Sequence, residues 1–157
     1  MSRYTLRLVL GFGILLAGNC AGEVVNLSGT WKLNIEKSKW GKVPKPVSVV
    51  VTVVHKEPAL KYAGKIVQME GEETREFSFS GAVDGKEYPV SRNIGDGKVI
   101  LKRIDDTTIE SNFKTNDGKF QEHVRTTVTK DGKLMRRMME RKGTSGEMAW
   151  LEVYEKQ

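Results

Sequence analysis

The chain has 157 residues, of which 38% are hydrophobic and 29% are charged, with 26 Lys and Arg, 20 Asp and Glu, and a single Cys. This is the length of one ordinary domain, and the composition excludes intrinsic disorder, a disulfide framework and a four-Cys zinc site. The formal charge of +6 is too weak and too dispersed along the chain to indicate a nucleic-acid partner.

The first segment of the chain has the layout of a secretory signal. Arg3 and Arg7 precede an apolar run over residues 8–17, and small residues follow that run. The run is shorter than the ~20 residues that a membrane-spanning helix needs. We therefore expect residues 1–21 to be a signal peptide, residues 22–157 to form one domain, and the exported protein to be periplasmic or secreted.

Two interpretations of the end of this signal stay open. Residues 16–20, Leu-Ala-Gly-Asn-Cys, resemble a bacterial lipobox, in which the Cys becomes lipid-modified, although Ala17 and Asn19 depart from its usual residues. Ordinary cleavage beside the small residues Cys20, Ala21 and Gly22 is the other interpretation. A lipid on Cys20 would tether the protein to a membrane, and we expect no other membrane contact.

From about Leu27 onward, short β-type runs alternate with turns that contain Gly. Four turns share the tripeptide Asp-Gly-Lys, beginning at residues 84, 96, 117 and 131, and Asp-Gly favours tight hairpins. This spacing leaves no room for crossover helices. The run Val47–His55 is almost continuously β-branched, which predicts burial on both of its faces. The ten expected strands cover residues 29–35, 47–55, 60–69, 74–80, 86–90, 98–104, 108–115, 119–129, 133–141 and 147–154.

Two segments have a less regular pattern. Glu36–Pro46 is broken by prolines, so we expect a loop with one short helical turn after the first strand, with Trp40 as an apolar plug at one end of the sheet. Lys133–Arg141 has Leu and Met at helical spacing, but a hairpin turn precedes it and Gly143–Gly146 follows it, which favours a strand.

An antiparallel sheet of this size exposes unpaired backbone groups at its two edges unless it closes on itself. A two-sheet sandwich is the alternative, but its crossing connections are longer than these hairpins. The sequence therefore predicts an all-β fold: a ten-stranded antiparallel up-and-down barrel, closed or nearly closed, in which the first strand pairs with the last.

Both ends of this domain resemble the calycin superfamily, which contains the lipocalins and the fatty-acid-binding proteins. Residues 27–33, Leu-Ser-Gly-Thr-Trp-Lys-Leu, look like the superfamily's opening strand, and Val-Tyr-Glu-Lys at 153–156 is similar to the last strand of the fatty-acid-binding branch. The opening also resembles small exported lipocalin-like proteins of bacteria. The resemblance implies that Gly29 and Trp31 are structural residues at the closed end of the barrel, and that the barrel carries a small apolar ligand.

The same resemblance implies positions for a head-group site. In the fatty-acid-binding branch, an Arg on a late strand and an Arg-x-Tyr on the last strand hold a carboxylate. Arg125 and Tyr154 match the first and last of these residues, but Glu152 stands where the middle Arg is expected. A carboxylate there would repel a fatty-acid head group, and the two-helix lid of that branch is missing as well. These departures argue against free fatty acids and leave a hydrophobic or amphipathic ligand.

The orientation of these side chains is open at this point. Arg125 faces solvent if the alternating apolar residues of its strand face the core, and faces the interior if the barrel holds a wet cavity. Glu152 could pair with Arg125 or Arg136 across the barrel. The late methionines suit loose ligand selection or plain core filling. The candidate ligand contacts are Arg125, Met138, Trp150, Glu152 and Tyr154.

No catalytic motif or Gly-rich phosphate loop occurs, and two His on different strands do not make a metal site. We expect no cofactor, no metal, no catalytic residue and a monomer. Three hypotheses remain: an exported ligand-binding barrel, an envelope structural or protein-interaction barrel without a ligand, and an enzyme on the same barrel. An enclosed space of ~300 Å³ or more favours a ligand. An inward His–acid pair or two inward carboxylates would favour the enzyme.

Overall fold

The computed structural model describes residues 24–157, and ten strands in chain order make up its regular structure. Every expected strand is present, with ends that differ by a few residues, and Lys133–Arg141 is a strand as predicted. No helix occurs among the described residues. The strands are β1 (Gly29–Leu33), β2 (Ser48–Lys56), β3 (Ala59–Val67), β4 (Arg75–Ala82), β5 (Glu87–Arg92), β6 (Gly95–Asp105), β7 (Thr108–Thr115), β8 (Gln121–Val128), β9 (Leu134–Gly143) and β10 (Gly146–Lys156).

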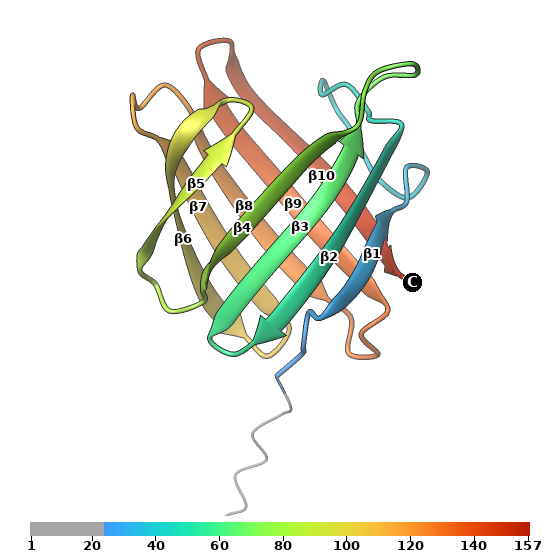
Figure 1. Ribbon diagram of the computed structural model, residues 1–157, viewed down its shortest axis with the longest axis vertical. Helices are drawn as coiled ribbons and strands as arrows, with labels where there is room; N and C mark the ends of the chain where they lie inside the picture. The colour runs from blue at the N-terminus through green and yellow to red at the C-terminus, as the bar shows by residue number, and fades with distance from the viewer. Residues whose placement is uncertain (1–23) are drawn as a thin grey trace, which may run out of the picture.

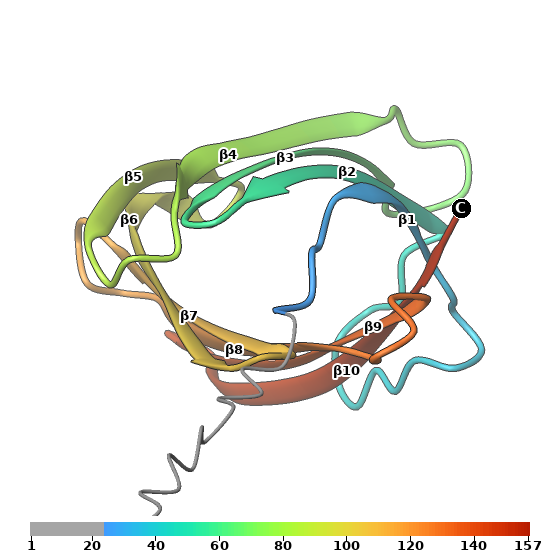
Figure 2. The ribbon, with the colours of Figure 1, turned by 90° about the horizontal axis from the view of Figure 1, so that it is seen from below.

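These strands form one antiparallel sheet that curls into a ring. The order across the sheet is β4-β3-β2-β1-β10-β9-β8-β7-β6-β5, and β1 pairs with β10, with Leu33 opposite Tyr154. The predicted contact between the first and last strands is therefore confirmed, as is the up-and-down barrel (Figures 1 and 2). Strands β4 and β5 share no ladder of backbone hydrogen bonds. We call this break in the ring the seam, and because of it the barrel is nearly closed.

Three of the Asp-Gly-Lys tripeptides connect successive strands. Gly118 and Gly132 adopt positive φ in the hairpin turns between β7 and β8 and between β8 and β9, as predicted. Gly85 also has positive φ, but it links β4 to β5 across the seam. At this position the tripeptide reverses the chain without forming a paired hairpin.

The fourth tripeptide is not a turn, and the predicted reversal at Asp96 is wrong. Asp96 and Gly97 both lie inside β6, and the turn from β5 to β6 is at residues 93–94, directly before Gly95, which has a φ of 124°. Gly97 is required for a different reason, because a Cβ atom there would clash with the carbonyl oxygen of Lys114 and would lie 2.7 Å from the ring of Phe113. A glycine that the close packing of β6 against β7 requires was therefore interpreted as a turn glycine.

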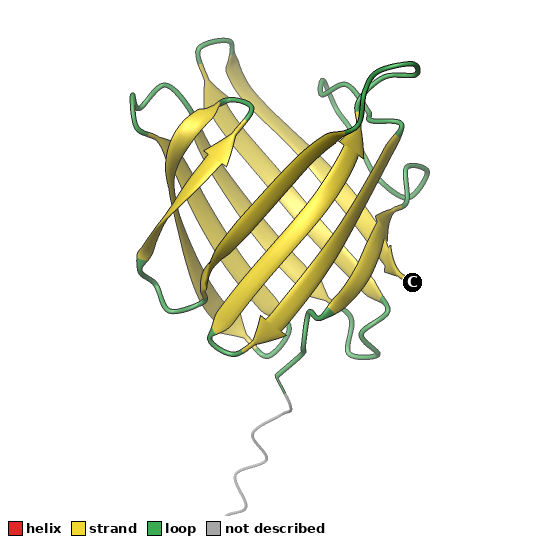
Figure 3. Cartoon of the chain, in the orientation of Figure 1, coloured by secondary structure: helices red, strands yellow, loops and turns green. Residues whose placement is uncertain are grey.

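The β-branched run in β2 is buried on one face only. Val49, Val51 and Val53 are buried, whereas Val50 and Val54 are 37% and 62% exposed. The expectation of burial on both faces is therefore wrong. The wall of this barrel is a single sheet with no second layer outside it, so the outward face of β2 meets solvent despite its apolar composition (Figure 3).

The loop between β1 and β2 contains turns and no helical turn, which corrects that expectation. It continues along β10 where β1 ends: Lys39 bridges to Leu151, and the Ser38 hydroxyl accepts the Val153 N–H at 3.0 Å. Trp40 of this loop packs against the main core and against a smaller cluster around Trp150. The loop therefore lines the upper part of β10.

The opposite end of the barrel is closed by the chain that precedes β1. Trp31 is fully buried, and its indole N–H donates to the Leu27 carbonyl at 2.8 Å. The Leu27 N–H donates in turn to Nδ1 of the buried His55 at 3.2 Å, and the Val25 N–H donates to the Asp106 carbonyl at 2.8 Å. Residues 24–28 therefore cross this end of the barrel (Figure 2), which we call the closed half.

The predicted signal peptide and Cys20 lie outside the described residues. Within residues 24–157, no helix is long and apolar enough to cross a membrane.

Candidate ligand-binding site

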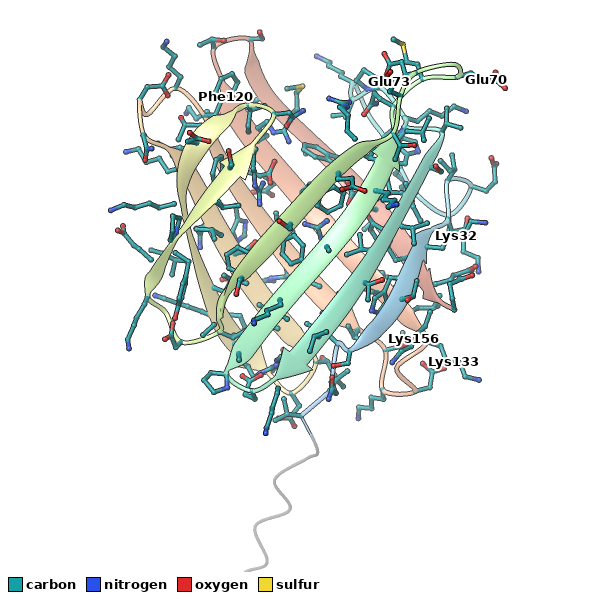
Figure 4. All side chains as sticks on the ribbon, in the orientation of Figure 1. Lys32, Glu70, Glu73, Phe120, Lys133 and Lys156 are labelled. Carbon is teal, nitrogen blue, oxygen red and sulfur yellow. The ribbon has the colours of Figure 1, made fainter. Side chains whose placement is uncertain are left out.

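The burial pattern of β8 shows which of its side chains face the interior. On β8, Glu122, Val124 and Val128 are buried, whereas Gln121 and Arg125 are exposed. The apolar set therefore faces inward, and the polar set of this strand faces solvent. Figure 4 shows that side chains lie on both the inner and the outer side of the barrel wall.

One inward carboxylate, Glu152 on β10, accepts hydrogen bonds from three side chains. Trp150 Nε1 donates to Oε1 at 2.9 Å, Tyr154 OH donates to Oε2 at 3.0 Å, and Arg137 Nη1 donates to Oε2 at 3.2 Å. Burial, together with the charge of Glu152, raises the pKa of Tyr154, so the phenol remains a protonated donor. We call these four residues the Glu152 cluster.

A second inward carboxylate, Glu122 on β8, lies between two guanidinium groups. Its side chain is fully buried, and Arg141 Nε and Nη2 donate to Oε2 at 2.9 and 2.6 Å, while Arg92 donates to Oε1. Burial alone would raise the pKa of Glu122, but the charges of Arg92 and Arg141 hold it below its usual range. We call these three residues the Glu122 cluster.

Aromatic rings connect and support the two clusters. The guanidinium of Arg141 lies 5.1 Å from the centre of the Trp150 ring, and that of Arg92 lies 4.5 Å from the centre of Phe113. Trp150 therefore contacts both clusters, with its ring against Arg141 and its N–H on Glu152. Cation–π contacts of this kind stabilise guanidinium groups that have left bulk water.

The charged side of the interior retains accessible surface. Although these side chains point into the barrel, Arg137 is 27% exposed, Arg141 22%, Arg92 19% and Glu152 15%. Surface on an inward side chain can only be reached by water that enters the ring of strands. This part of the interior, which we call the polar half, therefore retains surface that water can reach.

The opposite wall of the interior is apolar and aromatic. Val49 and Val51 of β2 and Phe79 of β4 are buried against the core. The Tyr62 ring stacks on Phe79 at 5.3 Å between centres and meets Phe77 edge-on at 6.2 Å. Strands β2–β4 lie across the ring from β7–β10 (Figure 2). The interior therefore combines an apolar wall with a wall that carries hydrogen-bonding groups.

Three of the five candidate ligand contacts come together in the interior, namely Trp150, Glu152 and Tyr154. The other two lie on the outside of the barrel. The Arg125 side chain is 56% exposed and donates to Glu110 at 2.6 Å, and Met138 is 55% exposed. Both residues face solvent because successive side chains of a strand point to opposite faces, and each of the two lies next to an inward-facing residue.

The partner of Glu152 is Arg137, where Arg125 or Arg136 was expected. Arg136 neighbours Arg137 on β9, and a shift of one residue along a strand reverses the face. The signal for Arg137 was present in the sequence, because Arg137 and Arg141 alternate in phase with the buried Met135 and Met139. Arg92 and Glu122 were also missed, since no local motif marks them.

His55 and Glu57 form a close His–acid pair at the closed half. His55 Nδ1 accepts the Leu27 N–H, and its Nε2 bonds to Glu57, so both ring nitrogens are engaged. Hydrogen bonds from Arg103 Nε and Nη2, both at 3.0 Å, lower the pKa of Glu57. The His55 side chain is 2% exposed. This pair therefore holds the segment that precedes β1 and has no free nitrogen to serve as a general base.

A hollow of about 980 Å³ follows strands β5–β10 near the turns after β7 and β9. Outward-facing residues such as His123 and Glu140 line it, together with Glu122 and Arg141. It therefore borders the Glu122 cluster and does not extend to Arg137. In the described part of the chain, no group of three or more His, Cys, Asp or Glu is arranged to hold a metal ion.

No protein-family model matches the chain, and no characterised protein matches its sequence. Solved structures do match its fold. A Schistosoma mansoni fatty acid binding protein in complex with arachidonic acid matches with a TM-score of 0.58 at 10% identity, over 87% of this chain and 99% of that one. A zebrafish ileal bile acid-binding protein with cholic acid matches with a TM-score of 0.57 at 13% identity, over 83% and 98%.

A third match is secretory abundant heat soluble protein 4 from Ramazzottius varieornatus, with a TM-score of 0.56 at 15% identity, over 87% of this chain and 97% of that one. At these identities the likeness is one of fold. The chain therefore shares its nearly closed antiparallel barrel fold with these three solved structures.

Proposed function

We propose that this protein is an exported binding protein that carries a small apolar or amphipathic molecule inside its barrel. The observation that carries the proposal is the division of the interior. The apolar wall of β2–β4 faces a wall with hydrogen-bonding groups, and those groups keep accessible surface. Ligand sites typically combine an apolar lining with a few placed polar groups.

The orientation of the ligand follows from this division. The apolar body lies along Val51, Tyr62 and Phe79, where burial of apolar surface contributes most of the binding free energy. The polar end lies at the Glu152 cluster, where Arg137 provides donors. The apolar part of the ligand therefore contacts the apolar wall, and its polar end contacts the wall that carries hydrogen-bonding groups.

The fold comparisons support a ligand in the interior. Two of the three solved structures hold one, arachidonic acid in one case and cholic acid in the other. Both are described as binding proteins and not as enzymes, which supports a non-catalytic role here. We extend this role to our chain on the strength of its own divided interior, since the identities are 10% and 13%.

The export part of the proposal rests on the sequence. Residues 1–21 have the charged start, the short apolar run and the small residues of a signal peptide. In this proposal the mature protein acts in the periplasm or outside the cell, as a monomer, either free or tethered through a lipid on Cys20.

A protein-interaction role without a ligand is the second candidate. The outward face of β2 favours it, because Val50 and Val54 are exposed there beside Lys32, Lys61 and Lys65. Lys32 lies on the outside of β1 (Figure 4). In this case the exterior of the barrel would be the functional surface, and the interior would serve only stability.

The test combines native mass spectrometry with a dye. Protein purified from its own source should carry a bound species that is lost on denaturation, and ligand-free protein should bind the neutral apolar dye Nile red. Thr126 faces the interior beside Arg137, and Arg125 next to it faces solvent. We expect Thr126→Trp to fill the interior and weaken dye binding by about tenfold or more, and Arg125→Trp to leave it unchanged.

Circular dichroism of both variants checks that the barrel has folded. Identical native and denatured masses, together with no binding of Nile red, would exclude the carrier function and favour the interaction role.

A further inference from the structure

We propose that Glu152 makes the interior selective for an uncharged ligand that bears a hydroxyl group, and against a ligand that ends in a carboxylate. This inference rests on the proposed function and specifies the chemical class of its ligand. It depends on which hydrogen-bonding positions of the Glu152 cluster are already occupied and which are free.

Arg137 supplies free donors. Its Nη1 donates to Glu152 at 3.2 Å, and within residues 24–157 this is the one hydrogen bond from its guanidinium. A guanidinium carries several further N–H donors in a fixed plane. The side chain is 27% exposed on the inside of the barrel, so these donors meet water that a ligand can displace.

Glu152 supplies a free acceptor. An ionised carboxylate can accept about four hydrogen bonds. Oε2 accepts from Arg137 and Tyr154, whereas Oε1 accepts from Trp150 alone. With 15% of the side chain exposed, one position on Oε1 is left for a donor from the interior.

A hydroxyl group can use both the free donors of Arg137 and the free acceptor position of Glu152. It can accept from Arg137 and donate to Glu152 at the same time, because a hydroxyl is both donor and acceptor. Its transfer from water is also less costly than that of an ion. An apolar molecule with one hydroxyl therefore satisfies both vacant positions while its body lies on the wall of β2–β4.

A carboxylate does not match this site. It cannot donate to Glu152, and it places a second negative charge beside the first. The charge of Arg137 is already balanced by Glu152, so a ligand carboxylate gains little net attraction while it loses its hydration. The protein's own carboxylate therefore occupies the role that a ligand carboxylate would take.

The Glu122 cluster is the competing position for an acidic ligand, since it holds two guanidinium groups and one carboxylate. Arg141 is engaged there through Nε and Nη2 and lies against Trp150, and Glu122 itself is fully buried. Arg92 is the residue of this cluster that has free donors, because within residues 24–157 its guanidinium donates one hydrogen bond, which goes to Glu122. A carboxylate bound at Arg92 is the outcome that would contradict our inference.

The experiment measures competition between two matched ligands and Nile red at neutral pH. Dodecanol and dodecanoate have the same chain and differ in the head group. Because an ion partitions less readily into any apolar space, the informative quantity is the change in the ratio of the two Kd values between variants. We expect Glu152→Gln, which removes the charge and keeps the shape, to shift that ratio about tenfold toward dodecanoate.

The matched control is Glu140→Gln on β9. Glu140 faces outward and its side chain is 63% exposed, so the ratio should stay as in the unaltered protein. A double variant, Arg137→Met with Glu152→Leu, removes the ion pair as a unit, a change that proteins often tolerate. In this variant dodecanol should bind about tenfold more weakly than in the unaltered protein, because both of its hydrogen bonds are lost.

The results separate this inference from the proposed function. If Nile red binds but Glu152→Gln and Glu140→Gln give the same ratio, the carrier function stands and the head-group inference is wrong. The inference is also wrong if dodecanoate binds more tightly than dodecanol and loses affinity in Arg92→Gln. If Nile red and both ligands fail to bind, the proposed function fails together with it.

Discussion

The two halves of the barrel interior are stabilised by different means. In the closed half, Trp31 and Val128 have at most 1% of their surface exposed, and the packing of apolar side chains supplies the stability. In the polar half, charged groups face one another and water still reaches some of them. The comparison shows that one short barrel can keep a dense core at one end and paired ions at the other, so that two means of stabilisation are separated along its axis.

The largest expected effect is on the closed half. Trp31→Ala should lower the free energy of unfolding by about 3–5 kcal/mol, because it leaves a large cavity among buried side chains and removes the hydrogen bond to Leu27. Urea denaturation followed by circular dichroism measures this loss. Val54→Ala on the outer face of β2 is the control and should change stability by less than about 0.5 kcal/mol. If the two substitutions lowered the stability equally, the closed half would not be more tightly packed than the outer face of β2.

A smaller but substantial effect is expected in the polar half. Glu122→Gln should destabilise the protein by about 3 kcal/mol at neutral pH, because it leaves Arg92 and Arg141 without a buried counter-charge. Glu140→Gln, on the outward face of the neighbouring strand, should cost less than about 1 kcal/mol. A stabilised Glu122→Gln variant would show that the ion cluster opposes folding.

The difference in stability between the unaltered protein and Glu122→Gln should also depend on pH, in a direction that the pKa of Glu122 defines. The pKa of Glu122 is lowered in the folded protein, so its stabilising contribution is present above the ordinary Glu value near 4.5 and is lost as the pH falls through the lower, folded value. The stability difference between the unaltered protein and Glu122→Gln should therefore be constant near neutrality and shrink below about pH 4.5. Denaturation series at several pH values measure this difference, and a gap that widens toward acid pH would contradict the assignment.

The smallest effect is expected outside the barrel. Arg125→Ala should change the free energy of unfolding by less than about 1 kcal/mol, because the Arg125 side chain is 56% exposed and its ion pair with Glu110 is on the surface. Nile red binding should also be unchanged. A loss of dye binding in this variant would show that the outer face of β8 takes part in ligand binding.

Much of the fold could be predicted from the sequence because the strands are local. Alternation, hairpin turns and the Gly-x-Trp opening each depend on a few neighbouring residues, and they identified ten strands and the pairing of β1 with β10. The error at Asp96 has a non-local cause, since Gly97 is there to accommodate Phe113 of the next strand. The error on β2 also came from outside the strand, because composition alone does not reveal whether a second layer covers it.

The candidate site was only half predictable for a related reason. Trp150, Glu152 and Tyr154 follow one another at alternate positions, so a single strand brings them together. The groups that bind them come from the neighbouring strand β9: Arg137 directly and Arg141 through Trp150. Whether a residue such as Arg125 points inward depends on the parity that its strand takes in the sheet, and β8 carries polar residues at both parities, because Glu122 and Thr126 share theirs with Val124 and Val128.

The seam is the place in the described barrel wall where two neighbouring strands can separate at the lowest cost in free energy. Everywhere else in the described ring, parting two strands would break a row of backbone hydrogen bonds, whereas between β4 and β5 it separates side chains such as Phe79 and Tyr88, whose rings meet edge-on at 6.3 Å. Pro89 of β5 keeps that edge from recruiting a neighbouring strand through its own amide. We therefore expect thermal breathing of the barrel to be concentrated in this one sector, which would give a ligand of the proposed kind a sideways route in and out.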